Sequence, residues 1–252
     1  GGILAHNIAC QYGLKAYIAD PVIVDEMEPL ARISGWPAIE RISVFHALNQ
    51  KAVARRFARE RESTVQDYNL IVAHMGGGIS VGAHRRGKVI DVNNALTGDG
   101  PFSPERTGGL PLFSLIELCF SGRYTEEELK KTLVGEGGLA AYLGTSDGRE
   151  VEKRIEAGDE KARLIFEAMA YQVAKEIGSA SAVLCGDVDA ILLTGGLAYG
   201  EMFVKWITDR VHFLAPVHVY PGEDELLALA EAVSETITGN EPVLVYEKEC
   251  RR

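Results

Sequence analysis

The segment 70–80 combines a histidine with three consecutive glycines at the end of an apolar run. The β-branched run before His74 predicts a strand, and a second strand is predicted after Gly78. Glycines lack a Cβ, so a bulky group can approach their backbone and several N–H groups can point at it. We expect positive φ at Gly77. Clustered N–H groups favour an anion, commonly phosphate, which His74 could also reach; the alternative is a glycine-rich hairpin with a structural histidine.

A second pair of glycines, Gly195 and Gly196, also follows an apolar run. Two such turns in one chain suggest a nucleotide in a cleft, with phosphates on one turn and adenosine on the other. Between them, the loop 93–110 is rich in Gly, Pro, Asn and Asp, and Arg106 is its one basic residue. Loops of this length are usually functional or disordered, and its prolines favour order. This inventory suits phosphoryl transfer, which needs backbone N–H groups, a metal held by carboxylates and a cation.

Three carboxylates stand at ends of predicted elements. Asp20 follows the strand candidate 15–19 and precedes a proline, which suits a site residue or an Asx-type turn cap. Asp147 opens a short helix and could act only as its cap. Glu225 lies at the start of the last helix, where the helix dipole alone favours an acidic residue.

Composition narrows the class of protein. The chain has 252 residues, with 36 acidic against 26 basic side chains and a formal charge of −10. This balance argues against a nucleic-acid surface and against an anionic membrane as partner. No apolar run reaches the roughly 18 residues of a membrane span. Four scattered cysteines without a C-x-x-C pair indicate reduced thiols and a cytoplasmic location.

Hydrophobic periodicity predicts an α/β chain. Three strands are expected between Asp67 and Asp91, then strands at 189–196 and 216–221. Helices are expected near the N-terminus, after Gly196 and after Gly222, and at 43–60, 110–121, 125–134 and 159–184. A three-stranded meander followed by helices is typical of the ribonuclease-H-like unit of actin-type ATPases.

Four motifs carry a resemblance to a known family. The segments 74–80, 91–96, 100–108 and 193–198 resemble the butyrate kinases, a branch of the acetate kinase family in the sugar kinase, Hsp70 and actin superfamily. The resemblance extends over essentially the whole chain. It implies an ATP-dependent carboxylate kinase that interconverts butyrate, or a similar short or branched fatty acid, and ATP with butyryl phosphate and ADP. Acetate or propionate kinase and an inactive nucleotide-binding fragment are the alternatives.

The resemblance also implies roles for matched residues. The phosphate turn would be His74 with Gly76, Gly77 and Gly78. Arg106 would stabilise the transferring phosphoryl group, Phe45 and His46 would lie near the acyl and phosphoryl site, and Asp20 would position metal or arginine. Magnesium would be linked to Glu225, and adenosine would lie beside Asp147, Arg149, Gly195 and Gly196. Acetate kinases carry asparagine where this chain has Gly77, which we interpret as a subfamily difference. The alternative for His46 is that it caps its helix or packs against it.

Family members begin with a strand and an Asn-x-Gly-Ser-type turn, neither of which occurs in this sequence, which begins at Gly1 without a methionine. We therefore expect a remnant of a first domain at 1–42, a complete second ribonuclease-H-like domain at 43–224, and a last helix, 225–252, returning to the first domain. The full-length form is expected to be a homo-oligomer. Residues 1–252 alone are expected to lack activity and to expose apolar faces at Ile3, Leu4, Ile8 and 226–233, which promote association.

Overall fold

The fold is built on one five-stranded sheet, seen in a computed structural model that describes residues 1–239. Its strands are β1 Asn69–Met75, β2 Ile79–Arg85, β3 Lys88–Val92, β4 Ala190–Gly195 and β5 Val217–Pro221, in the order β3-β2-β1-β4-β5. The first three strands are antiparallel, whereas β1, β4 and β5 are parallel. The predicted meander and both later strands are therefore confirmed.

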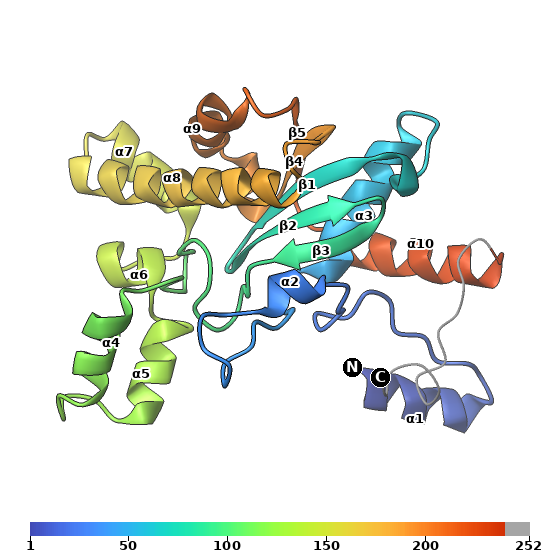
Figure 1. Cartoon of the computed structure of the whole chain (residues 1–252), viewed down its shortest axis with the longest axis horizontal. Helices are drawn as coiled ribbons and strands as arrows, with labels where there is room; N and C mark the ends of the chain where they lie inside the picture. The colour runs from blue at the N-terminus through green and yellow to red at the C-terminus, as the bar shows by residue number, and fades with distance from the viewer. Residues whose placement is uncertain (240–252) are drawn as a thin grey trace.

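Helices cover both faces of this sheet (Figure 1). The α-helices are α1 Gly2–Tyr12, α2 Pro29–Arg32, α3 Ala47–Arg59, α4 Leu112–Cys119, α5 Glu126–Leu133, α6 Gly138–Leu143, α7 Gly148–Glu156, α8 Glu160–Val183, α9 Glu201–Val211 and α10 Glu225–Ile237. Short 3-10 turns lie at η1 Val65–Asp67 and η2 Gly196–Tyr199. Helices α8 and α9 lie on one face of the sheet and α3 on the other, while α4 and α5 extend away from it. The sequence predicted these helices except α2 and α6.

Strand β1 is buried on both faces, which explains its unbroken apolar run. Ile71, Ala73 and Met75 belong to the core shared with α8 and α9, whereas Leu70 and Val72 pack toward α3. Successive side chains of a strand point to opposite faces, so a strand between two helical layers is apolar at every position. This sandwich fixes the end of β1, where His74 and the glycine turn lie.

Helix caps predicted from the sequence are present. Thr125 and Glu128 form a reciprocal capping box, in which the Glu128 N–H donates to Thr125 Oγ1 at 3.3 Å and the Thr125 N–H donates to Glu128 Oε2 at 2.7 Å. Asp147 caps α7 by accepting from the Arg149 N–H at 2.9 Å. Local side-chain hydrogen bonds of this kind satisfy orphan N–H groups, which is why they can be predicted from spacing.

The strand expected at 15–19 is wrong. This segment has no regular structure and pairs with no strand in the described part of the chain. Asp20 therefore does not end a strand; its φ is 36°, and its carboxylate lies 3.1 Å from Arg55 Nη2 and 3.8 Å from Lys51 Nζ. A short apolar segment forms a strand only when it pairs with the edge of a sheet. Neither edge strand of this sheet, β3 or β5, pairs with residues 15–19.

Large apolar side chains are exposed at both ends of the described chain, as expected, although Ala228 and Ala232 within the expected face 226–233 are buried. Ile3, Leu4 and Leu226 are 82%, 65% and 82% exposed. Within residues 1–239, no helix is long and apolar enough to cross a membrane. Cys10, Cys119 and Cys185 are free thiols. The division at 42 and 224 stays a prediction, and the part of the predicted 225–252 segment beyond Gly239 lies outside the described residues, as does Cys250.

Candidate active site

The glycine turn joins β1 to β2 and is closed by the Gly76 N–H, which donates to the Gly78 carbonyl at 3.0 Å. None of Gly76, Gly77 and Gly78 has a left-handed φ, so the expectation of positive φ at Gly77 is wrong. Lack of space requires glycine at position 78 but not at position 77. A Cβ at Gly78 would overlap the Arg106 guanidinium, whereas a Cβ at Gly77 would make an ordinary 3.5 Å contact with Glu105 Oε2.

Arg106 lies against this turn because its loop is attached there. Its Nη1 donates to the Ala95 carbonyl, and its own carbonyl accepts from the Ser103 N–H at 3.0 Å. The Ser103 hydroxyl in turn donates to the Gly77 carbonyl at 2.6 Å. Burial lowers the pKa of Arg106 from its usual value, although Glu105 opposes this change. A partly desolvated guanidinium is therefore held beside the backbone that would meet phosphate.

Two histidines stack at the same end of the sheet. The rings of His46 and His74 are 3.8 Å apart and 13° from parallel. His74 Nδ1 lies 2.9 Å from Asn49 Oδ1, and its Nε2 lies 3.2 Å from Glu223 Oε1. Burial, followed by the neighbouring His74, lowers the pKa of His46 to about 3, whereas the hydrogen bond to His74 lowers the pKa of Glu223. His46 is therefore neutral near pH 7.

A cavity of about 620 Å³ connects the turn with the predicted adenosine segment. Gly76, Gly77 and Glu105 line one part of the cavity, and the rest of its wall comes from α7, α8, η2 and Glu223. That wall comprises Ser146, Asp147, Gly148, Arg149, Glu152, Phe166, Gly196, Leu197, Tyr199 and Gly200, together with Pro104. The volume is in the range of small-molecule sites. The structure thus brings together two sequence motifs that were predicted to hold phosphate and adenosine.

The two glycines after β4 have different surroundings. Gly196 lines the cavity, whereas Gly195 does not. Gly195 has φ 90°, and a Cβ there would lie 2.5 Å from the Met75 carbonyl oxygen. Glycine at position 195 therefore lets the end of β4 approach the end of β1, which places Gly196 near the phosphate turn.

Phe45 and Asp20 are predicted site residues that do not line this cavity. Phe45 is 2% exposed and packs with Ala47, Val89 and Val92. Asp20 is neutralised by the cations of α3 described above. Their assigned roles stay predictions.

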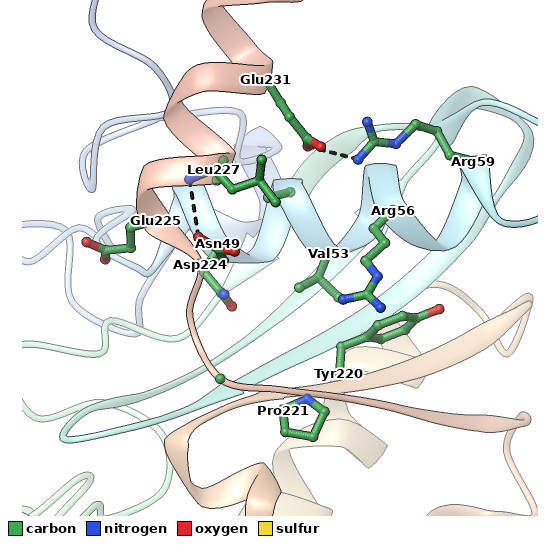
Figure 2. A pocket seen from close by; sticks show the side chains of 13 residues that line it. Asn49, Val53, Arg56, Arg59, Tyr220, Pro221, Asp224, Glu225, Leu227 and Glu231 are labelled. Carbon is green, nitrogen blue, oxygen red and sulfur yellow. Dashed lines mark hydrogen bonds and ion pairs between the residues drawn. The ribbon is translucent and has the colours of Figure 1, made fainter.

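Glu225 lines a different and smaller cavity, of about 120 Å³, between α3 and α10 (Figure 2). Its side chain points away from Arg56 and Tyr220, which lie on the other side of that cavity. The acidic residue that reaches the phosphate turn is Glu223, two residues earlier. The predicted role of Glu225 at magnesium stays a prediction. In residues 1–239 no group of three or more His, Cys, Asp or Glu side chains is arranged to hold a metal ion.

Sequence reasoning missed several polar residues of the site. Glu105 is adjacent to Arg106, and Glu223 belongs to an acidic run after β5, so both had a weak local signal. Glu152 lines the cavity, and its Oε1 is buried without a hydrogen-bond partner. Burial, with help from Glu156 and Glu201, raises the pKa of Glu152.

Comparisons with known proteins identify related sequences and related folds. Butyrate kinase 2 of Clostridium acetobutylicum is 56% identical over 247 residues, which cover 98% of the chain and 69% of that protein. The acetate kinase of Porphyromonas gingivalis superimposes with a TM-score of 0.76 at 21% identity, over 85% of this chain and 62% of that one. A propionate kinase of Francisella tularensis gives 0.70 at 24% identity, over 82% and 60%. The chain thus spans less than two thirds of either solved structure, and these two likenesses confirm the expected fold alone.

A model of the acetokinase family matches residues 38–231, which include the glycine turn, the Arg106 loop and both walls of the larger cavity. The expectation of a carboxylate kinase of the butyrate kinase type is confirmed at the level of the family. By this match and by its identity to a butyrate kinase over nearly its whole length, the chain belongs to the acetokinase family.

Proposed function

We propose that the protein interconverts ATP and butyrate, or a similar short or branched fatty acid, with ADP and an acyl phosphate. The observation that carries this proposal is that residues of both glycine motifs line the same cavity, together with α7: Gly76, Gly77, Asp147, Arg149 and Gly196. A nucleotide in this cavity would have its phosphates on the turn and its adenosine against α7 and η2. The identity to a butyrate kinase supports butyrate over acetate as the acceptor.

The chemistry requires little from the protein beyond charge and position. A carboxylic acid is already ionised near pH 7, so its oxygen attacks the γ-phosphorus without a general base. The bond from phosphorus to the bridging β–γ oxygen breaks, and ADP leaves. Arg106 and the N–H groups of the glycine turn would stabilise the charge on the transferring group. His46, neutral and stacked on His74, would approach the same group from the β1 side.

Magnesium suits the carboxylates of this cavity. Mg²⁺ keeps several waters and usually takes one or two protein carboxylates together with substrate phosphates. Glu105 and Glu223 line the cavity beside Gly76 and Gly77, so they could hold such an ion, with Glu225 as the further candidate from the sequence. When bound, the ion would neutralise charge on the nucleotide phosphates.

We also propose a cytoplasmic location for the protein and a homo-oligomer for its full-length form. The free thiols of Cys10, Cys119 and Cys185 fit a reducing compartment. The exposed apolar side chains of α1 and α10 would favour self-association of residues 1–252 alone.

Two measurements test this function. Calorimetric titration should detect binding of ADP to the chain. Gly196→Val should weaken this binding, because its side chain would occupy the adenosine part of the cavity. Gly178→Val on α8, where a Cβ meets no atom within 4 Å, is the control. Acyl phosphate formed by the full-length natural protein from ATP and acids of C2 to C6 should be trapped by hydroxylamine, with the highest kcat/KM for butyrate or its branched relatives. A preference for acetate or propionate would replace the acyl assignment, and no product from any acid would contradict the function.

A further inference from the structure

A buried chain of hydrogen bonds lies behind His46. His46 Nδ1 is 2.8 Å from Ser80 Oγ, and Ser80 Oγ is 2.8 Å from Gln50 Nε2. Gln50 Oε1 is 3.0 Å from His84 Nε2. Ser80 and Gln50 are fully buried, and His84 is 2% exposed. Polar side chains so deeply buried must pair with one another, so the direction of each hydrogen bond can be worked out.

The Gln50 amide sets the direction of the chain. Its Nε2 donates to both Ser80 Oγ and the Ser80 carbonyl, the latter at 3.1 Å. Its Oε1 can only accept, so His84 must carry its proton on Nε2. Since Ser80 Oγ accepts from Gln50 and, at 3.4 Å, from the His46 backbone N–H, its own proton is free for His46 Nδ1.

We propose that Ser80, oriented by Gln50 and His84, is a positioning residue that holds neutral His46 with its proton on Nε2. Nδ1 then accepts from Ser80, and Nε2–H is directed to an oxygen of the transferring phosphoryl group. This use of Nε2 rests on the proposed function. In the described part of the chain, no hydrogen bond uses His46 Nε2, so this donor is free for substrate.

The surroundings of His46 favour this form. Burial is the largest influence on the pKa of His46 and lowers it. His74 and Arg106 lower this pKa further, and Glu223 raises it by less than burial lowers it. With Nδ1 protonated instead, the ring would present a lone pair to an anionic oxygen, which is repulsive. A fixed tautomer therefore decides whether His46 attracts or repels the phosphoryl group.

The tautomer can be measured directly by ¹⁵N NMR of the histidine side chains in the chain without substrate. The signals of His46 are assigned by their loss in His46→Gln. In the wild-type protein at pH 7, Nε2 should show the shift of a protonated nitrogen and Nδ1 that of an unprotonated one. Protonated Nδ1, or an even mixture of the two forms, would overturn the proposal without any further variant.

Two substitutions test which residue sets the tautomer. Ser80→Ala should convert the His46 signals toward a mixture of tautomers, and Ser80→Thr, which keeps the hydroxyl, should restore the wild-type pattern. Ser181→Ala, at a buried serine of α8 that does not contact His46, is the control and should leave the pattern unchanged. Unchanged His46 signals in folded Ser80→Ala would overturn the proposal.

The spectrum and the activity separate this inference from the proposed function. In the full-length natural protein, Ser80→Ala should lower kcat about 10-fold, roughly the upper value of one neutral hydrogen bond, with KM for ATP nearly unchanged. A correct tautomer in a protein that phosphorylates no acid would contradict the function alone. A wrong tautomer in an active kinase would contradict the inference alone.

Discussion

Acidification from pH 7 to pH 5 is expected to destabilise the fold through His84. This side chain is buried, and its Nε2 donates to Gln50 Oε1. Burial, followed by the positive charge of Lys51, lowers the pKa of His84 to about 3. In the unfolded chain the same imidazole is exposed to water and titrates near 6.5.

The size of the effect follows from these two pKa values. Between pH 6.5 and pH 3 the unfolded chain binds a proton that the folded chain does not, so the free energy of unfolding falls as the pH falls through this window. Above pH 6.5 this loss is absent. At pH 5 it is about 2 kcal/mol for one such histidine. That figure depends mainly on the unfolded pKa, because the folded histidine is still neutral at pH 5.

Urea unfolding at pH 7 and pH 5 would measure this loss, with the wild-type protein compared with His84→Gln. Glutamine keeps a side-chain N–H donor toward Gln50 but does not titrate. The free energy of unfolding of the variant, relative to wild type, should therefore rise by about 2 kcal/mol between pH 7 and pH 5. His212→Gln, at an exposed histidine after α9, is the control. An equal acid sensitivity of His84→Gln and wild type would refute the reasoning.

Four further outcomes are expected. Arg106→Ala in the full-length natural protein should lower kcat by about 10³ or more while nucleotide affinity is largely kept, and Arg106→Lys should not restore it, because a point charge replaces a fork; a kcat within a few-fold of wild type would remove Arg106 from the site. Gly78→Ala should also lower kcat, since its Cβ displaces the Arg106 guanidinium; normal steady-state kinetics would show that Arg106 does not act from this position. Gly77→Val should weaken ADP binding in calorimetry with an unchanged circular dichroism spectrum, because Gly77 lines the cavity; unaltered affinity would mean that the turn is only a hairpin. Leu226→Lys should reduce concentration-dependent association in sedimentation velocity, because this leucine is 82% exposed.

Local physics explains what the sequence alone determined. Apolar runs and glycine turns predicted β1 to β5, and capping residues such as Thr125 and Asp147 predicted where helices begin. These signals act within a few residues, so they can be recognised without knowing the fold. The motifs around His74, Arg106 and Gly195 were sufficient to indicate the family, which the comparisons then confirmed.

Tertiary structure decided what those residues touch. The sequence placed acidic residues at 223, 224 and 225, but only the shared sheet, in which β4 pairs with both β1 and β5, brings Glu223 to His74. The structure also shows that Gly77 has no positive φ. Position 78 must be glycine because the guanidinium of Arg106, from the loop 93–110, lies against it. Ser80 gave no chemical signal in the sequence, because its hydroxyl matters only when α3 sets Gln50 and His46 beside it. Contacts between segments distant in sequence depend on how whole elements pack, and no local pattern records them.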